Sequence, residues 1–128
     1  MKTRATRTVS ESFNLLENAL LHILCSGTDT EASIAREQLG KASWGGYEHD
    51  GCDCFLIDVT PSGGIRSIAH DGGPFSFAEV SDGNETLGFL ELWVVDKRLH
   101  SVNYMPFGDD HVALPSPEDY TITLIEKE

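Results

Sequence analysis

The segment 86–95 limits the possible folds more than any other part of this sequence, because it is the longest and most apolar extended stretch. Its side chains divide between the two faces of a strand, with Phe89, Glu91, Trp93 and Val95 on one face and Leu90, Leu92 and Val94 on the other. A strand that is apolar on both faces is usually an inner strand, covered by helix on at least one side. We therefore expect this segment to be central in a sheet, with Phe89 and Trp93 in the core.

Before Trp44, apolar residues recur at the spacing of a helix. The positions three and four residues apart are Phe13, Leu16, Leu20, Ile23 and Leu24. This pattern predicts a helix that has one of the serines before Phe13 as its N-cap and ends near Cys25. A second helix is predicted to begin at a capping box formed by Thr28 and Glu31 and to end at Gly40. The short connection between them predicts an αα-hairpin.

After Trp44, extended segments alternate with turns rich in Gly, Pro, Asp and Asn. Besides 86–95, we expect strands over 52–60, 65–69, 75–80, 98–107 and 120–125, the last at a sheet edge, and a hairpin at 81–84. The predicted fold class is α+β, with an N-terminal helical hairpin packed on a mostly antiparallel β-sheet of four to six strands. The 128 residues predict a single domain, 1–128, of which residues 1–8 are disordered.

The charge of the chain is strongly negative and unevenly distributed. Nine basic residues against 21 acidic ones give a formal charge of −12, and the stretch 48–126 holds 15 acidic residues and three basic ones. Such a field repels nucleic acid and anionic membranes and attracts a cationic protein surface. We therefore predict a protein partner, with no nucleic acid and no membrane, although acidity that serves only solubility needs no partner.

Acidic residues in the turns and loops of the strand region, with aromatic neighbours beside the long loop, are the candidates for partner binding. They are Asp71, Asp82, Glu85, Asp109, Asp110, Glu118, Asp119, Tyr104 and Phe107. Exposed carboxylates would steer a cationic partner, and aromatic residues are favoured anchors of protein interfaces.

A cluster of His49, Cys52 and Cys54 mixes residue types that bind metals. The two cysteines lack the second ligand pair of a structural zinc site, so we expect them to pack as small hydrophobes. No nucleophile elbow, Walker motif or dinucleotide-binding fingerprint occurs. We predict a protein that is not an enzyme and has no cofactor or metal; a metal-dependent or thiol enzyme at this cluster, or an adaptor domain, are the alternatives. An odd cysteine count without a secretory signal predicts a cytoplasmic protein.

Three short patterns follow one another between Leu87 and Tyr120. They are a strand that ends in Val94-Val95-Asp96, a return strand from Arg98-Leu99 to Tyr104, and the turn Leu114-Pro115-Ser116-Pro117. This stretch, about a quarter of the chain, resembles the C-terminal part of small acidic bacterial immunity proteins of contact-dependent growth inhibition and polymorphic toxin systems. Lys97 departs from the pattern, in which Gly follows the Asp. The resemblance implies binding and neutralisation of a cognate toxin, one that is cationic and of the nuclease type.

Overall fold

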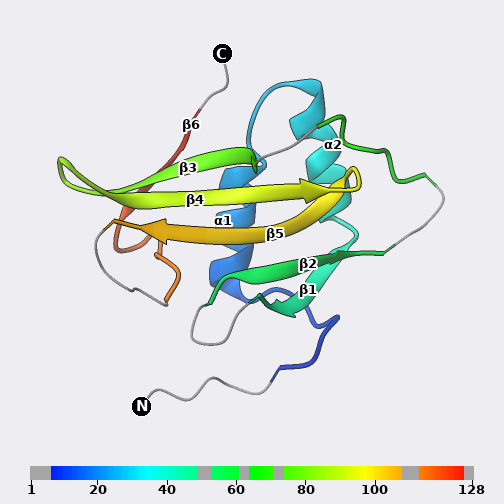
Figure 1. Ribbon diagram of the computed structural model, residues 1–128, viewed down its shortest axis with the longest axis horizontal. Helices are drawn as coiled ribbons and strands as arrows, with labels where there is room; N and C mark the ends of the chain where they lie inside the picture. The colour runs from blue at the N-terminus through cyan, green and yellow to red at the C-terminus, as the bar shows by residue number, and fades with distance from the viewer. Residues whose placement is uncertain (1–6, 49–52, 61–63, 71–73, 108–112, 126–128) are drawn as a thin grey trace.

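The computed structural model of this protein describes residues 7–48, 53–60, 64–70, 74–107 and 113–125. Its elements in chain order are α1 (Leu15–Leu24), α2 (Thr30–Leu39), β1 (Ala42–Tyr47), β2 (Phe55–Val59), β3 (Pro74–Asp82), β4 (Glu85–Val95), β5 (Arg98–Pro106) and β6 (Thr121–Ile125). The six strands form one antiparallel sheet in the order β1-β2-β5-β4-β3-β6 (Figure 1). The predicted α+β class and antiparallel sheet are confirmed, with six strands.

Strand β4 occupies the inner position that its sequence predicts. It lies between β3 and β5, and Leu90 and Leu92 on its helix-covered face are fully buried. A tight turn links β4 to each neighbour: Gly83, at φ +64°, follows Asp82 before β4, and Asp96 and Lys97, at φ +53° and +66°, lead into β5. The second turn needs positive φ at both residues, and Lys97 adopts it although Gly would do so at lower cost.

The two helices lie on the same side of the sheet (Figure 1). Helix α1 contacts β3, β4 and β6, whereas α2 contacts β1 and β5. The Ser76 hydroxyl of β3 donates a hydrogen bond of 2.8 Å to the carbonyl of Leu24 at the end of α1. The predicted αα-hairpin is not confirmed, because the contacts of each helix are mainly with its own set of strands. Within the described residues, neither helix is long and apolar enough to cross a membrane.

Both helices begin at a cap that differs from the predicted one. Asn14 caps α1 in a complete capping box: its side chain accepts the Glu17 amide at 2.7 Å, and the Glu17 carboxylate accepts the Asn14 amide at 2.9 Å. Asp29 caps α2 by accepting the Ala32 amide at 2.8 Å. Asn and Asp cap a helix as well as Ser or Thr does, so the choice of a serine for α1 and of Thr28 for α2 was wrong.

Glu31 and the segment after β2 also differ from prediction. Glu31 accepts the Ala69 amide at 2.5 Å, so its carboxylate ties α2 to the segment 64–70. That segment was predicted to contain a strand over 65–69 and contains none. Its fully buried Ile68 donates instead to the Lys97 carbonyl at 2.9 Å, at the turn between β4 and β5. Ile68 is therefore buried without strand pairing, whereas Ile65 is half-buried and Ala69 is exposed.

The strand β1 was not predicted, because two glycines interrupt its pattern. A side chain at Gly45 would lie 3.0 Å from the backbone of Leu56, so glycine permits β1 to approach β2 closely. Gly46, at φ +107°, lies in the irregularity of register between Trp44 and Tyr47. Glycine inside a strand often marks such a bulge. Here the two glycines made the sequence of an edge strand resemble that of a turn.

Buried Gln38 joins three parts of the chain. Its side chain is 1% exposed, and its amide nitrogen donates to the carbonyls of Arg66 and Lys97 at 2.7 and 3.0 Å. Its amide oxygen accepts the Leu99 amide at 2.9 Å. Helix α2, the segment 64–70 and the start of β5 are thereby held by one side chain with good hydrogen-bond geometry.

An ion pair holds the first described residue against the core. The Arg7 guanidinium donates to both oxygens of Glu17, at 2.7 and 2.8 Å, and lies 3.8 Å from the ring centre of Trp44. Hydrogen bonding to Glu17 raises the pKa of Arg7 above its ordinary value. The segment predicted to be disordered, 1–8, lies outside the described residues except for Arg7 and Thr8, and Arg7 is fixed by these contacts.

Replacing Glu17 is expected to destabilise the protein far more than replacing Glu37, which pairs with Arg66 at the surface. Glu17 is 2% exposed, so Glu17→Ala leaves a largely buried guanidinium without its partner and should lower the free energy of unfolding by about 3 kcal/mol. Glu37→Ala should leave that free energy nearly unchanged, because exposed pairs contribute little. Urea denaturation of both variants measures the difference, and equal losses would contradict the structural role given to Arg7 and Glu17.

Gln38→Met preserves the length of the side chain and removes all three of its hydrogen bonds. Because two carbonyls and one amide then lose a buried partner, we expect the free energy of unfolding to fall by about 2 to 3 kcal/mol. Chemical denaturation measures this loss, and Leu39→Met, at a half-buried neighbour in α2, is the matched control. Wild-type stability in Gln38→Met would show that water replaces the amide without cost.

Candidate protein-binding surface

Most of the predicted partner-binding residues that the structure describes meet at one end of the sheet. Asp82 and Glu85 flank the turn between β3 and β4, and the amide of Phe107 donates to the carbonyl of Leu87 at 2.7 Å. Thr121 pairs with Ser81, so the residues just before β6 reach the same end. We call Asp82, Glu85, Glu118 and Asp119 the acidic end (left side of Figure 1). All four are exposed, as is Phe107.

The described lysines and arginines lie elsewhere in the molecule. Lys97 and Arg98 are at the turn between β4 and β5, at the opposite end of β4 from Glu85. The others are Arg7 against Glu17, Arg36 in α2, Lys41 just after α2, and Arg66 beside Glu37. Arg36 is further engaged by the carbonyls of Cys25 and Gly27, both at 2.7 Å. The folded chain therefore separates its described cations from the acidic end.

The remaining predicted residues divide into two groups. Asp71, Asp109 and Asp110 lie outside the described residues. Tyr104 pairs with Leu90 on the helix-covered face and packs against the core, and its ring lies over Gly88, where a side chain would come within 3.0 Å of it. Burial raises the pKa of the Tyr104 hydroxyl, and the nearby Tyr120 adds to this shift. Tyr104 thus supports the strands behind the acidic end, whereas Phe107 presents its ring to solvent.

The face of the sheet opposite the helices was not predicted as a functional surface. Phe89 and Trp93, expected in the core, lie on this face and are only half-buried. Phe89 pairs with Met105 and its ring lies 5.5 Å from that of Phe107. Large exposed side chains continue the surface: Phe77, Met105, Phe107 and Ile125 are 36 to 56% exposed. Contiguous apolar surface of this kind commonly marks an interaction site.

A groove of about 460 Å³ crosses this open face over β4 and β5. Its lining residues are Glu48, Cys54, Glu91, Trp93, Val95, His100, Ser101, Asn103, Tyr104 and Met105. Strand β2 pairs with β5 only through Phe55 with Val102 and Leu56 with Ser101, so the start of β2 and the end of β1 form the far wall. The volume lies in the range of small-molecule binding pockets.

The polar side chains of the groove are carboxylate, imidazole, hydroxyl, amide and indole groups. Glu91 is 9% exposed and accepts a hydrogen bond of 3.1 Å from the indole nitrogen of Trp93. His100 Nδ1 and the Ser101 hydroxyl are 3.0 Å apart. Among the described residues no lysine or arginine lines this groove. Alternation of Phe89, Glu91 and Trp93 along β4 was the one sequence signal of this site, since a strand buried on both faces would not carry a carboxylate between two aromatic rings.

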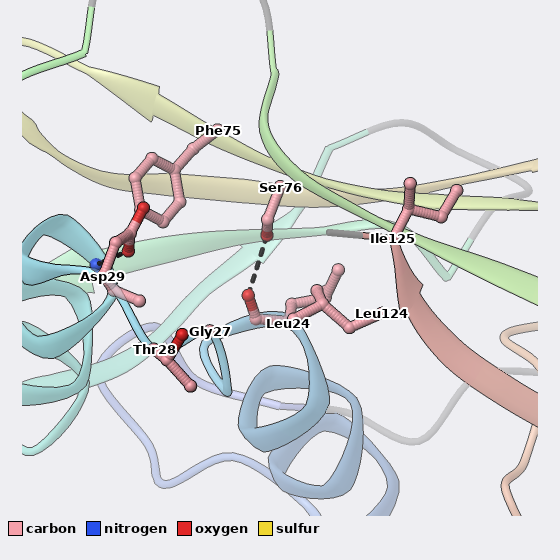
Figure 2. Close-up of a pocket in the computed structure, with 9 residues that line it drawn as sticks. Leu24, Gly27, Thr28, Asp29, Phe75, Ser76, Leu124 and Ile125 are labelled. Atoms are coloured by element: carbon pink, nitrogen blue, oxygen red, sulfur yellow. Dashed lines mark hydrogen bonds between the residues drawn. The ribbon is translucent and has the colours of Figure 1, made fainter. Parts of the chain in front are cut away.

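A second cavity, of about 140 Å³, lies where the end of α1 and the start of α2 meet β3 and β6 (Figure 2). Leu24, Phe75 and Leu124 supply apolar walls, and the Ser76 hydroxyl is bonded to the Leu24 carbonyl. The Asp29 carboxylate at its rim caps α2. This space is smaller than usual ligand pockets, and these polar groups already serve the fold, so it is a packing gap.

The thiols offer little chemistry in the described part of the chain. Cys25 is fully buried and Cys54 is 3% exposed, with the Tyr104 amide donating to the Cys54 sulfur at 3.3 Å. Desolvation raises the pKa of Cys25 to about 12. His49 and Cys52 lie outside the described residues, and no three acidic, histidine or cysteine side chains within them are placed to hold a metal ion. Burial of Cys54 agrees with its predicted packing as a small hydrophobe.

Comparison of the chain with known proteins finds no matching protein-family model, no matching curated protein and no matching solved structure.

Cys25 is expected to be unreactive in the folded protein. In a Cys52→Ser, Cys54→Ser variant it is the sole thiol, and a pKa of about 12 leaves roughly one molecule in ten thousand as thiolate at pH 8. A disulfide reagent should therefore label Cys25 only after unfolding in urea, and native labelling should speed up as the pH rises toward 12. Rapid labelling at pH 8 without denaturant would contradict the burial of this thiol.

Proposed function

We propose that this chain is a bacterial immunity protein that binds and neutralises a cognate toxin, a cationic one of the nuclease type, through its acidic end. The observation that carries the proposal is the gathering of Asp82, Glu85, Glu118 and Asp119 at one end of the sheet, while the described cations lie elsewhere. The resemblance of the stretch 87–120 to immunity proteins of toxin systems supports the same function.

The acidic end suits inhibition by charge complementarity. A nuclease needs a cationic cleft to hold the phosphates of its substrate, and a row of carboxylates laid over that cleft occupies the same positions. Attraction between exposed charges extends about 8 Å at physiological ionic strength, so it acts mainly on the rate of encounter. Phe107, 56% exposed beside these carboxylates, provides an apolar anchor that holds the complex once formed.

Reversal of the acidic end should slow association with the toxin. In the variant Asp82→Lys, Glu85→Lys, Glu118→Lys, Asp119→Lys, we expect the association rate at low salt to fall at least about tenfold and its decrease with salt to flatten. The reading frame beside this gene is sequenced first, and the toxin domain that the proposal expects there, purified in an inactive form, is the ligand. Stopped-flow measurements at two salt concentrations give the rates, and growth of cells that express the active toxin reports neutralisation.

The control tests whether position matters beyond total charge. The double variant Glu37→Lys, Asp58→Lys is compared with Asp82→Lys, Glu85→Lys, since both change the net charge equally and all four residues are exposed. We expect the pair at the acidic end to slow association several-fold more than the control pair. Equal rates in the two double variants, or full protection by the fourfold variant, would refute a directed acidic surface.

A further inference from the structure

The groove on the open face contains a carboxylate that is largely removed from water. Glu91 is 9% exposed, and its only described hydrogen bond comes from the neutral indole of Trp93. Glu48, at the rim formed by the end of β1, adds a second carboxylate. Arg98 pairs with Val95 at the end of β4 but does not line the groove. Such a site favours a cation that brings its own hydrogen-bond donors.

The shape of the groove and its apolar lining residues indicate which kind of cation it can bind. Trp93 and Met105 give flat and flexible apolar surfaces, which suit the methylene stem of a long basic side chain. Asn103 pairs with Glu91 across β5 and β4, so it lines the groove on the same face as the carboxylate. A guanidinium offers five donors in one plane and stacks on indole rings, whereas an ammonium is compact and more strongly hydrated. Arginine fits this combination best.

The groove and the acidic end belong to one continuous surface. Met105 lines the groove and pairs with Phe89, and Phe89 contacts the ring of Phe107 beside the acidic end. A partner that binds the acidic end can therefore also contact the apolar side chains of the open face as far as Glu91.

We propose that this groove receives an arginine side chain of the protein partner, which lies against the Trp93 ring and the Glu91 carboxylate. The inference rests on the proposed function for the cationic partner, and it identifies which group of that partner binds at the centre of the open face. The acidic end attracts the partner at a distance, and the groove selects a guanidinium after contact.

The test uses the whole protein, labelled with nitrogen-15, and two blocked tripeptides, acetyl-Leu-Arg-Leu-amide and its citrulline counterpart. Citrulline has nearly the shape of arginine and no charge. The two indole signals report separately: Trp93 lies in the groove, and Trp44, 3% exposed beneath the helices, is an internal control. We expect the arginine peptide to shift the Trp93 signal saturably and to leave Trp44 unmoved. The citrulline peptide should bind at least about fivefold more weakly.

Variants at two carboxylates separate the groove from the general charge. Glu91→Gln keeps an oxygen to accept the Trp93 hydrogen bond, so the fold should persist while affinity for the arginine peptide falls about fivefold. Glu79→Gln removes the same charge from a residue that bonds Thr86 on the open face outside the groove, and it should bind like wild type. Equal binding of both peptides to wild type, which needs no variant, would overturn the proposal, as would equal affinities of the two variants.

Failure of this inference is distinguishable from failure of the proposed function. If Glu91→Gln leaves the affinity for the toxin unchanged while reversal of the acidic end lowers it, the groove assignment is wrong and the immunity function stands. If the Trp93 signal responds specifically to the arginine peptide although the neighbouring toxin is not neutralised, the groove assignment stands and the partner is a different arginine-bearing protein.

Discussion

Two helices of ten residues each provide all the helical cover that the described part of the chain has for its six strands. Such a helix is about 15 Å long and about 10 Å across, and six strands at their usual spacing span roughly 24 Å. Two helices side by side therefore match the width of one face of the sheet. The other face is exposed to water because no described helix covers it. The side chains of β4 are therefore divided between the two faces: Leu90 and Leu92 lie under the helices, whereas Glu91 and Trp93 lie on the open face.

Buried polar contacts fix this one-sided cover at the inner strand β5 and at the edge strand β1. Gln38 fastens α2 to the start of β5, and the pairing of Arg7 with Glu17 presses the N-terminal segment onto Trp44 of β1. The backbone of β1 is itself covered, because the Ser10 amide donates to Trp44 and the Trp44 amide donates to Glu11, both at 2.8 Å. That segment blunts an edge that would otherwise pair with another chain. The open face can then carry exposed aromatic residues on a rigid support.

The sequence predicted those elements whose pattern one physical rule controls. The alternation of 86–95 located β4 and its inner position, and the positive-φ requirement at Gly83 located the hairpin before it. Prediction failed where competing contacts decide. Thr28 and Glu31 have capping-box spacing, yet Asp29 caps α2 and Glu31 bonds Ala69 instead. Glycine at 45 and 46 is a turn signal in any single sequence, and only the proximity of Leu56 reveals that it permits strand pairing.

The two candidate surfaces also differ in how far the sequence predicts them. The acidic end could be predicted in part, since charge is visible in composition and exposed turns hold Asp82 and Glu85; its assembly depended on strand order, which brings Thr121 beside Ser81. The groove was not predicted, because Phe89 and Trp93 fit a core position equally well until the helix-covered face is known, and Glu91 between them was the one contrary signal. Under the proposed function, the difference in exposure between the two surfaces has a physical reason. Screening by salt confines the acidic end to encounter, so its charges need exposure, whereas Glu91 distinguishes one cation from another only because water is largely excluded from it.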